Sequence, residues 1–105
     1  MSKNLSDIMR QAQKMQEKLK EVQEGLSAKT VSASSGGGMV TAEVSGALKL
    51  MKIKIDPSVL AASDIEMLED LVVSAVNEAF KRAQDMVSGE MNKVTMGLGI
   101  PPGLF

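Results

Sequence analysis

The first part of the chain carries apolar residues at alternating intervals of three and four positions. These residues are Leu5, Ile8, Ala12, Met15, Leu19, Val22 and Leu26. This is the spacing of a heptad repeat, in which one narrow apolar stripe runs along an α-helix. We therefore expect a helix over residues 4–26, capped at its start by Asn4 or Ser6 and ended near Gly25. A stripe this narrow suits a helix that contacts one partner and projects into solvent.

Three short segments follow in which apolar and polar side chains alternate. They predict strands at residues 30–34, 39–45 and 48–55. The connections between them are short, so the strands form an antiparallel meander. In the third strand the apolar phase slips near Leu50 and Met51. A β-bulge explains this slip, and so does a strand that is buried on both faces in a dimer.

A second long helix is expected after a proline at position 57, which ends the third strand, and a connector over residues 58–62. Ser63 and Glu66 have the spacing of a capping box, and Asp64 adds negative charge at the helix N-terminus. The apolar residues of this helix form a broad stripe, which is typical of a helix packed on a sheet. The predicted fold class is therefore α+β.

The chain ends in a segment that mixes glycine and proline with large apolar residues, and this composition disfavours a helix. We expect one α–β–β–β–α domain over residues 1–95 and a flexible, extended apolar tail over residues 96–105. A domain of 105 residues buries a limited fraction of its surface. Self-association is a common way of completing such a core.

The chain contains no cysteine and no histidine. It therefore lacks disulfides, thiol nucleophiles, imidazole acid–base groups and the usual ligands of zinc and copper. We expect no enzyme, no metal site, no cofactor and no small-molecule substrate. Aromatic residues make up 2% of the chain, which argues against stacking platforms for single-stranded nucleic acid.

No segment approaches the ~20 apolar residues that span a bilayer. No basic stretch followed by an apolar run resembles a signal peptide. We therefore expect a cytoplasmic protein without a membrane partner.

Charge is distributed unevenly, although the formal net charge is only −1. Residues 1–55 carry nine basic and five acidic groups, and residues 56–105 carry three basic and eight acidic groups. Arg10, Lys14 and Lys18 follow one another at intervals of four on the first helix. A row of cations at this spacing can follow the phosphates of a nucleic acid. An ordinary solvated helix face, balanced by nearby acids, explains the same spacing and is favoured by the spacing alone.

Other basic residues are weaker candidates. Lys49, Lys52 and Lys54 on the third strand either extend a positive patch or protect a strand edge, and edge protection is favoured. Lys81 and Arg82 are ordinary surface residues unless the fold brings them to the first helix. The candidate DNA-binding residues are Arg10, Lys14, Lys18, Lys3, Lys81 and Arg82.

Several stretches resemble the YbaB/EbfC family of bacterial nucleoid-associated proteins. They are MRQAQKMQ at residues 9–16, IKIDPS at 53–58, EMLEDLV at 66–72, AVNEA at 75–79 and GLGIPPGL at 97–104. The resemblance covers nearly the whole chain. It implies a tweezer-like α/β homodimer with projecting helices, association with DNA and the nucleoid, and effects on DNA organisation or gene expression. It implies no catalytic residue and no cofactor.

Two functions remain open at this point. The first is a homodimer that binds duplex DNA mainly through backbone charge, with weak sequence preference because no base-reading pattern of side chains is present. The alternative is a protein-interaction module that uses the heptad helix and the apolar tail.

Overall fold

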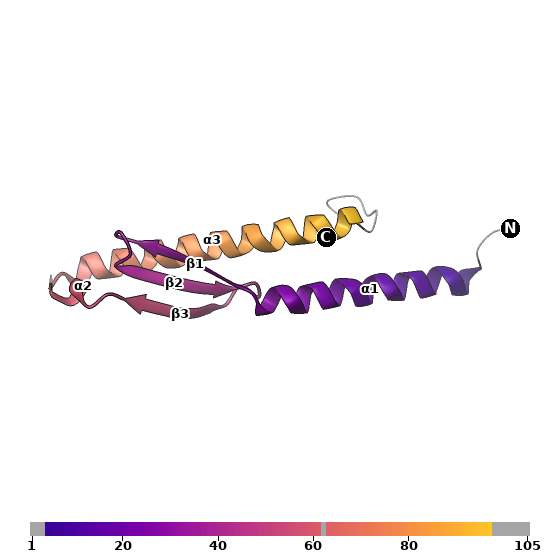
Figure 1. Ribbon diagram of the computed structural model, residues 1–105, viewed down its shortest axis with the longest axis horizontal. Coiled ribbons are helices and arrows are strands. Elements are labelled where there is room, and N and C mark those ends of the chain that lie inside the picture. Colours follow the sequence, from indigo (N-terminus) through magenta and orange to yellow (C-terminus); the bar gives the residue numbers. More distant parts are fainter. Residues whose placement is uncertain (1–3, 62, 98–105) are drawn as a thin grey trace.

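The computed structural model describes residues 4–61 and 63–97 of the chain. In chain order the elements are α1 (Leu5–Ala28), β1 (Thr30–Ser35), β2 (Val40–Ser45), β3 (Leu50–Ile55), α2 (Ser58–Ala61) and α3 (Ile65–Gly97). The strands form one antiparallel sheet in the order β1-β2-β3, with α3 lying along the sheet and α1 extending from its end (Figure 1). The predicted α+β fold is confirmed, and the tweezer-like homodimer stays a prediction.

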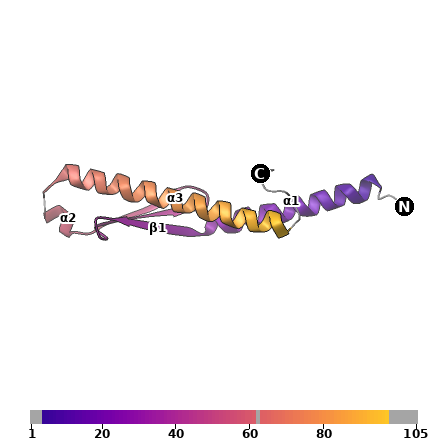
Figure 2. The same ribbon diagram turned by 90° about the horizontal axis from the view of Figure 1, so that it is seen from above.

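The core lies between α3 and the sheet, which form two layers (Figures 1 and 2). Ala75, Ala79 and Ala83 are fully buried, and their spacing of four places them on one face of α3. Their short side chains allow the helix to lie close to β1 and β2. The strand residues buried against this face are Ala33, Val40, Ala42 and Val44.

The pairing of β2 with β3 contains the predicted irregularity. Glu43 pairs with Lys52, but the next residue, Val44, pairs with Leu50. Met51 therefore has no partner on β2, which is the arrangement of a β-bulge. The bulge explains why the apolar phase slips at this point of the sequence.

Side-chain caps begin both long helices. The Asn4 carboxamide oxygen accepts a hydrogen bond of 2.9 Å from the Asp7 backbone N–H, as one of the two predicted caps of α1. At α3 the predicted capping box is wrong by one residue, because the Asp64 carboxylate accepts from the Met67 N–H at 3.0 Å. Ser63 has a φ of +50° and donates its N–H to the Leu60 carbonyl, so it closes the preceding turn.

The predicted connector after β3 contains one helical turn, α2. The Asp56 carboxylate accepts a hydrogen bond of 2.9 Å from the Ser58 N–H, and Val59 on this turn is buried. Hydrogen bonds from Ser58 lower the pKa of Asp56 below its ordinary value, and the nearby Lys54 ammonium lowers it further. The aspartate therefore remains ionised and holds the turn that leads into α3.

The second long helix extends further than expected. α3 runs to Gly97 and passes through Gly89, so Met96 and Gly97, which the sequence assigns to an extended tail, are helical. Helix ends shift readily by one or two residues. The rest of the predicted tail, residues 98–105, lies outside the described residues, and the domain boundary at residue 95 stays a prediction.

The chain is strongly elongated, with extents of 75 × 19 × 16 Å and a radius of gyration of 20.2 Å. A compact domain of this length has a radius of gyration of about 13 Å. The difference arises because α1 leaves the end of the sheet and points away from it, while the C-terminal part of α3 extends beside α1 (Figure 1). The expected projecting helix is therefore present.

Gly46 lies where the end of α1 meets the end of β2. A Cβ atom added to it would lie 1.9 Å from the Leu26 carbonyl oxygen, and its N–H donates a 2.9 Å hydrogen bond to the Lys29 carbonyl oxygen. Leu26 is buried at this junction. The close backbone contact requires glycine and sets the position from which α1 leaves the sheet.

We predict that Gly46→Ala lowers the free energy of unfolding by about 1–3 kcal/mol, because the added methyl group forces the junction apart. Gly25→Ala is the matched control, since a Cβ there meets nothing within 4 Å. Alanine is favoured over glycine in a helix by up to ~1 kcal/mol, so the control should be as stable as the wild type or more stable. Urea unfolding followed by circular dichroism at one protein concentration compares the two. Equal losses of stability would contradict the proposed contact.

Candidate nucleic-acid interface

The predicted row of cations lies on the exposed surface of α1. Arg10, Lys14 and Lys18 are exposed, and each is rotated by about 40° around the helix from the one before it. In the described part of the chain the ion pairs are Glu78–Arg82 and Glu90–Lys93, so no carboxylate pairs with this row. The three cations are therefore accessible to an anionic ligand.

The charge of α1 as a whole is balanced. The helix carries four basic residues and four acidic residues, and its acids are Asp7, Glu17, Glu21 and Glu24. The acids are interspersed with the basic row rather than gathered on another face. Attraction of a polyanion to α1 therefore depends on local contacts, and its long-range field is weak.

Arg82 lies beside the sheet and not beside the row on α1. Its Nη1 atom donates a 2.9 Å hydrogen bond to the Ser32 carbonyl oxygen, and its Nε atom lies 3.5 Å from the Glu78 carboxylate. Arg10 is 18 residues before the end of α1, which is about 27 Å of helix pointing away from the sheet. Lys81, the neighbour of Arg82, is exposed on α3, and Lys3 lies outside the described residues.

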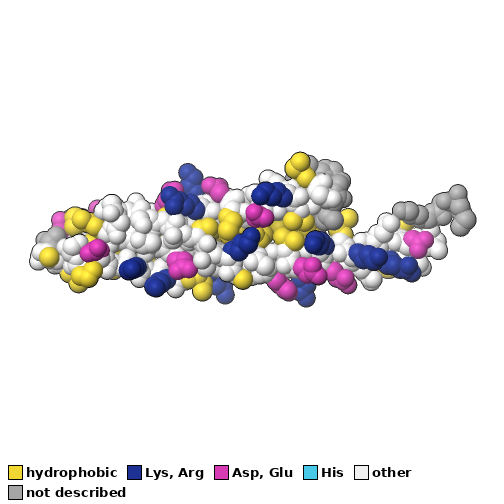
Figure 3. Space-filling view, in the orientation of Figure 1, with side chains coloured by type: hydrophobic (Ala, Val, Ile, Leu, Met, Phe, Trp, Pro, Cys, Tyr) yellow, Lys and Arg dark blue, Asp and Glu magenta, His cyan; other side chains and the backbone are white. Residues whose placement is uncertain are grey.

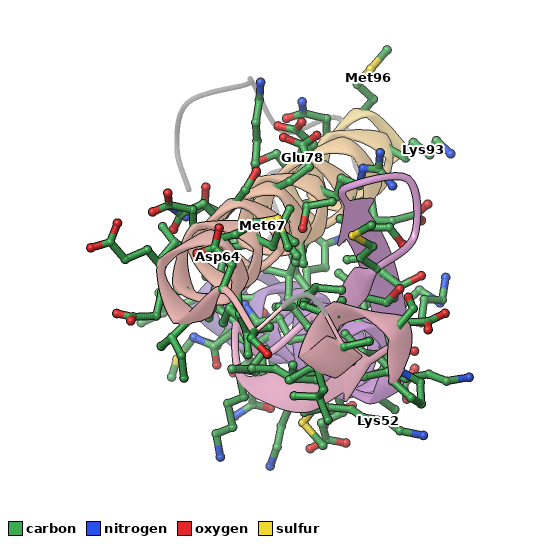
Figure 4. The ribbon with its side chains drawn as sticks, turned by 90° about the vertical axis from the view of Figure 1, so that its left-hand side faces the viewer. Lys52, Asp64, Met67, Glu78, Lys93 and Met96 are labelled. Atoms are coloured by element: carbon green, nitrogen blue, oxygen red, sulfur yellow. The ribbon has the colours of Figure 1, made fainter. Side chains whose placement is uncertain are left out.

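A second group of polar residues lies on the outer face of the sheet, the face that points away from α3. Val44 and Ala42 are buried under α3, so the residue between them, Glu43, faces outward together with its cross-strand partners Ser32 and Lys52. Figure 4 shows Lys52 on the side of the molecule opposite Glu78 and Lys93 of α3.

This outer face is hollowed, with a shallow volume of about 330 Å³. Its lining consists of Thr30, Val31, Ser32, Thr41, Glu43, Lys52 and Lys54. Hydroxyl and ammonium groups are thus gathered around a single carboxylate. The sequence alone predicts that these lysines either extend a positive patch or protect a strand edge. Their grouping with the hydroxyls of β1 depends on the strand register, which sequence spacing does not give.

The two edges of the sheet differ in how they are covered. At the β1 edge, Arg82 binds the Ser32 carbonyl, and the Ser35 hydroxyl donates a 2.6 Å hydrogen bond to the Leu71 carbonyl oxygen of α3. At the β3 edge all six residues are exposed, since α3 lies over β1 and β2. Ile53 and Ile55, which face the α3 layer, remain 38% and 39% exposed.

Apolar residues of α3 continue this exposed surface. An α-helix turns by about 100° per residue, which places Val73 and Phe80 on the flank of α3 opposite Leu71 and Arg82. Leu71 and Arg82 contact β1, so the flank with Val73 and Phe80 lies on the β3 side. Val73 is 58% exposed. Figure 3 shows hydrophobic side chains along the boundary between α3 and the layer beneath it. We call Leu50, Ile53, Ile55, Val73, Val76 and Phe80 the apolar stripe.

The heptad stripe of α1 is only partly covered. Its C-terminal half lies beside the end of α3 (Figure 2), where Leu26 is buried and Leu19 and Val22 are half-buried. Its N-terminal half extends further, and Leu5 and Ile8 are 70% and 52% exposed. α3 therefore covers about half of the predicted heptad stripe.

Two other kinds of feature are absent from the described residues. Among residues 4–61 and 63–97 no cluster of three potential metal-binding carboxylates occurs. Within the same residues no helix is long and apolar enough to span a membrane. The arrangement of exposed cations and apolar surface is suited to binding.

Comparison with known proteins identifies relatives over almost the whole chain. Residues 1–98 match the model of the YbaB/EbfC DNA-binding family. A nucleoid-associated protein of Thermoanaerobacter pseudethanolicus is 50% identical over 102 residues, which cover 97% of this chain and 91% of that protein. A nucleoid-associated protein of Acetivibrio thermocellus is 49% identical, covering 97% of this chain and 90% of that protein.

A solved structure shares the fold. The crystal structure of an uncharacterized protein from Helicobacter pylori matches with a TM-score of 0.69 and 22% sequence identity. The match covers 93% of this chain and 97% of that chain. At this level of identity the similarity concerns the fold alone.

The contacts of Arg82 predict a role in stability. Arg82→Ala removes a hydrogen bond that joins α3 to β1, and we expect the free energy of unfolding to fall by about 0.5–1.5 kcal/mol. Lys81→Ala removes the same charge from the next residue and should change stability by less than about 0.5 kcal/mol. Thermal or urea unfolding of both variants measures the difference. If both variants unfold alike, Arg82 is free on the surface like its neighbour.

Proposed function

Since the chain belongs to the YbaB/EbfC DNA-binding family, we propose that it is a nucleoid-associated protein that binds duplex DNA. The observation that carries this proposal is the family match over residues 1–98, with relatives of about 50% identity that are named nucleoid-associated proteins. In this role the protein acts in the cytoplasm, at the nucleoid, and affects DNA organisation or gene expression. Binding, and not catalysis, is its activity.

Contacts of α1 with the phosphate backbone form the first part of the proposed mode of binding. Arg10, Lys14 and Lys18 are exposed, and no described carboxylate neutralises them at ion-pair distance. Lys3, Lys81 and Arg82 are secondary candidates. Arg82 already donates one hydrogen bond to the Ser32 carbonyl oxygen, so it can contact DNA only through its other N–H groups or by exchanging that bond. Few cations contribute, so affinity is modest, falls with salt and depends weakly on base sequence.

Pairing of two copies through β3 forms the second part of the proposal. An uncovered strand edge presents free backbone N–H and C=O groups, which a second β3 strand can satisfy. The apolar stripe beside this edge is the surface that such pairing would remove from water. Fully burying one Ile or Phe side chain stabilises a complex by about 1.5–3 kcal/mol relative to leaving it exposed. The β1 edge is less suited, because Arg82 already occupies its Ser32 carbonyl.

A two-fold pair of this kind places one projecting α1 helix on each copy. The two arms then supply two copies of the same basic row to one duplex. This arrangement raises the local concentration of the second row once the first is bound. It is the physical reason for expecting a dimer to bind DNA better than a single chain with so few cations.

The basic row predicts a salt-dependent loss of binding. Arg10→Ala, Lys14→Ala and Lys18→Ala together should weaken binding to a ~30-base-pair duplex by roughly tenfold or more near 0.1 M salt. The slope of log K against log salt should become shallower by about 0.9 for each phosphate that the variant no longer neutralises. Fluorescence anisotropy over a salt series provides both quantities.

The matched control for this experiment removes three cations elsewhere, with Lys20→Ala, Lys29→Ala and Lys93→Ala. It changes net charge by the same amount and should retain most of the affinity. If the two triple variants bind alike, the row on α1 is not the contact surface. If the wild-type protein does not bind duplex DNA, the proposed function fails. The exposed part of the heptad stripe of α1 then favours a protein-interaction module instead.

The open edge predicts a dimer that a single charge disrupts. Ile53→Glu places a carboxylate in the apolar stripe of both copies, and its desolvation costs several kcal/mol. The dimer dissociation constant should rise by roughly 100-fold or more. Sedimentation velocity over a concentration series measures this constant. Met96→Glu is the control, because Met96 is 73% exposed and lies outside the stripe. A wild-type monomer, or equal dimerisation of both variants, would exclude this interface.

A further inference from the structure

Positive charge is concentrated in the sheet of this protein and not in its projecting helix. The segment from Thr30 to Ile55 contains three basic residues and one acidic residue. By contrast, α1 contains four of each sign, and α3 contains three basic and six acidic residues. A polyanion that approaches the described surface therefore meets the most favourable potential at the sheet.

The strand register places this charge on one face. Lys52 and Lys54 pair with Glu43 and Thr41, which face away from α3. Lys49 directly precedes β3, and its carbonyl oxygen accepts a 2.9 Å hydrogen bond from the Ser45 N–H. All three lysines are exposed, and no described carboxylate lies within ion-pair distance of them.

Hydroxyl groups surround these lysines. Thr30, Ser32 and Thr41 line the hollow of about 330 Å³ together with Lys52 and Lys54. The Ser34 and Thr41 hydroxyl oxygens lie 2.8 Å apart and share one hydrogen bond, which leaves one hydroxyl proton of the pair free to donate outward. Hydroxyl and ammonium donors are the groups that proteins use to contact phosphate and sugar oxygens of DNA.

We propose that the outer face of the sheet, formed by Lys49, Lys52, Lys54 and the hydroxyls of Thr30, Ser32 and Thr41, is a binding surface for the phosphate backbone of duplex DNA. This inference rests on the proposed DNA binding and adds a second contact surface to the row on α1. Lysine and hydroxyl donors lack the paired geometry that distinguishes bases, so the surface binds DNA of any sequence.

The arrangement of the layers allows both surfaces to act together. α1 continues from the end of the sheet in the layer opposite α3, as Figure 1 shows, and α3 is the most acidic element. A duplex that lies along the outer face therefore follows the molecule toward α1 and stays on the side away from the α3 carboxylates. If two copies join at β3, their lysines adjoin and the cationic surface doubles.

The test changes charge on the outer face in both directions. Lys49→Gln, Lys52→Gln and Lys54→Gln together remove three charges with little change in side-chain length, and we expect duplex affinity to fall by roughly tenfold or more near 0.1 M salt. Glu43→Gln removes the carboxylate from the hollow and should raise affinity by about two- to tenfold. A gain of affinity cannot result from misfolding. Anisotropy titrations of the full-length protein with the same duplex measure both effects, and the triple variant at Lys20, Lys29 and Lys93 is the control.

The outcomes separate this inference from the function on which it rests. Loss in the outer-face triple variant, gain in Glu43→Gln and little change in the control support the surface. If the wild type binds duplex DNA but the outer-face variants bind like the control, the inference is overturned and the proposed function stands. If the wild type does not bind duplex DNA at any salt concentration, the proposed function is overturned, and this inference falls with it. Circular dichroism and sedimentation confirm that each variant keeps the fold and association state of the wild type.

Discussion

The architecture depends on the close packing of three alanines of α3, at positions 75, 79 and 83, against two of the three strands. Small side chains on the helix bring it near β1 and β2 and leave β3 without a cover. The lengths of the elements reinforce this arrangement. A helix of 33 residues spans about 50 Å, whereas six-residue strands span about 20 Å. The long overhang of α3 is what lies beside α1 and makes the molecule extended.

As a consequence, the two faces of the sheet are suited to different partners. The side of the sheet under α3 is apolar, and its uncovered part beside β3 is suited to a second copy of the chain. The opposite side carries hydroxyl and ammonium groups and is suited to an anionic partner. Glu43 is the exception on that side, and it lies between Ser32 and Lys52 in the register. The proposed self-association and the proposed DNA binding therefore involve different residues of the sheet.

Local periodicity was sufficient to predict most of the fold. The heptad spacing predicted α1, the two-residue alternation predicted three strands, and the phase slip at Met51 corresponds to the bulge in β3. Details that depend on neighbouring structure were missed. Asp64 caps α3 because Ser63 is already used in the turn after α2, and sequence spacing alone does not distinguish these two caps.

The candidate site was less predictable for the same physical reason. Exposure of Arg10, Lys14 and Lys18 follows from helical spacing within a few residues. The position of Arg82 depends on its contact with Ser32, which is 50 residues away in sequence. The grouping of Lys52 and Lys54 with β1 hydroxyls likewise requires the pairing register of all three strands. Contacts within a helix were accessible from the sequence, whereas contacts between elements required the fold.

The junction at Gly46 also acts as the pivot of a lever. α1 has 24 residues and a length of about 36 Å; the contact between Gly46 and Leu26 fixes its base at the sheet, and its C-terminal half lies beside α3. A rotation of about 5° at this base moves the far end of a ~36 Å rod by about 3 Å. Small changes in backbone packing at one glycine are therefore amplified along the arm. In the proposed dimer, the span between the two arms would depend on this junction, far from the side chains proposed to contact DNA.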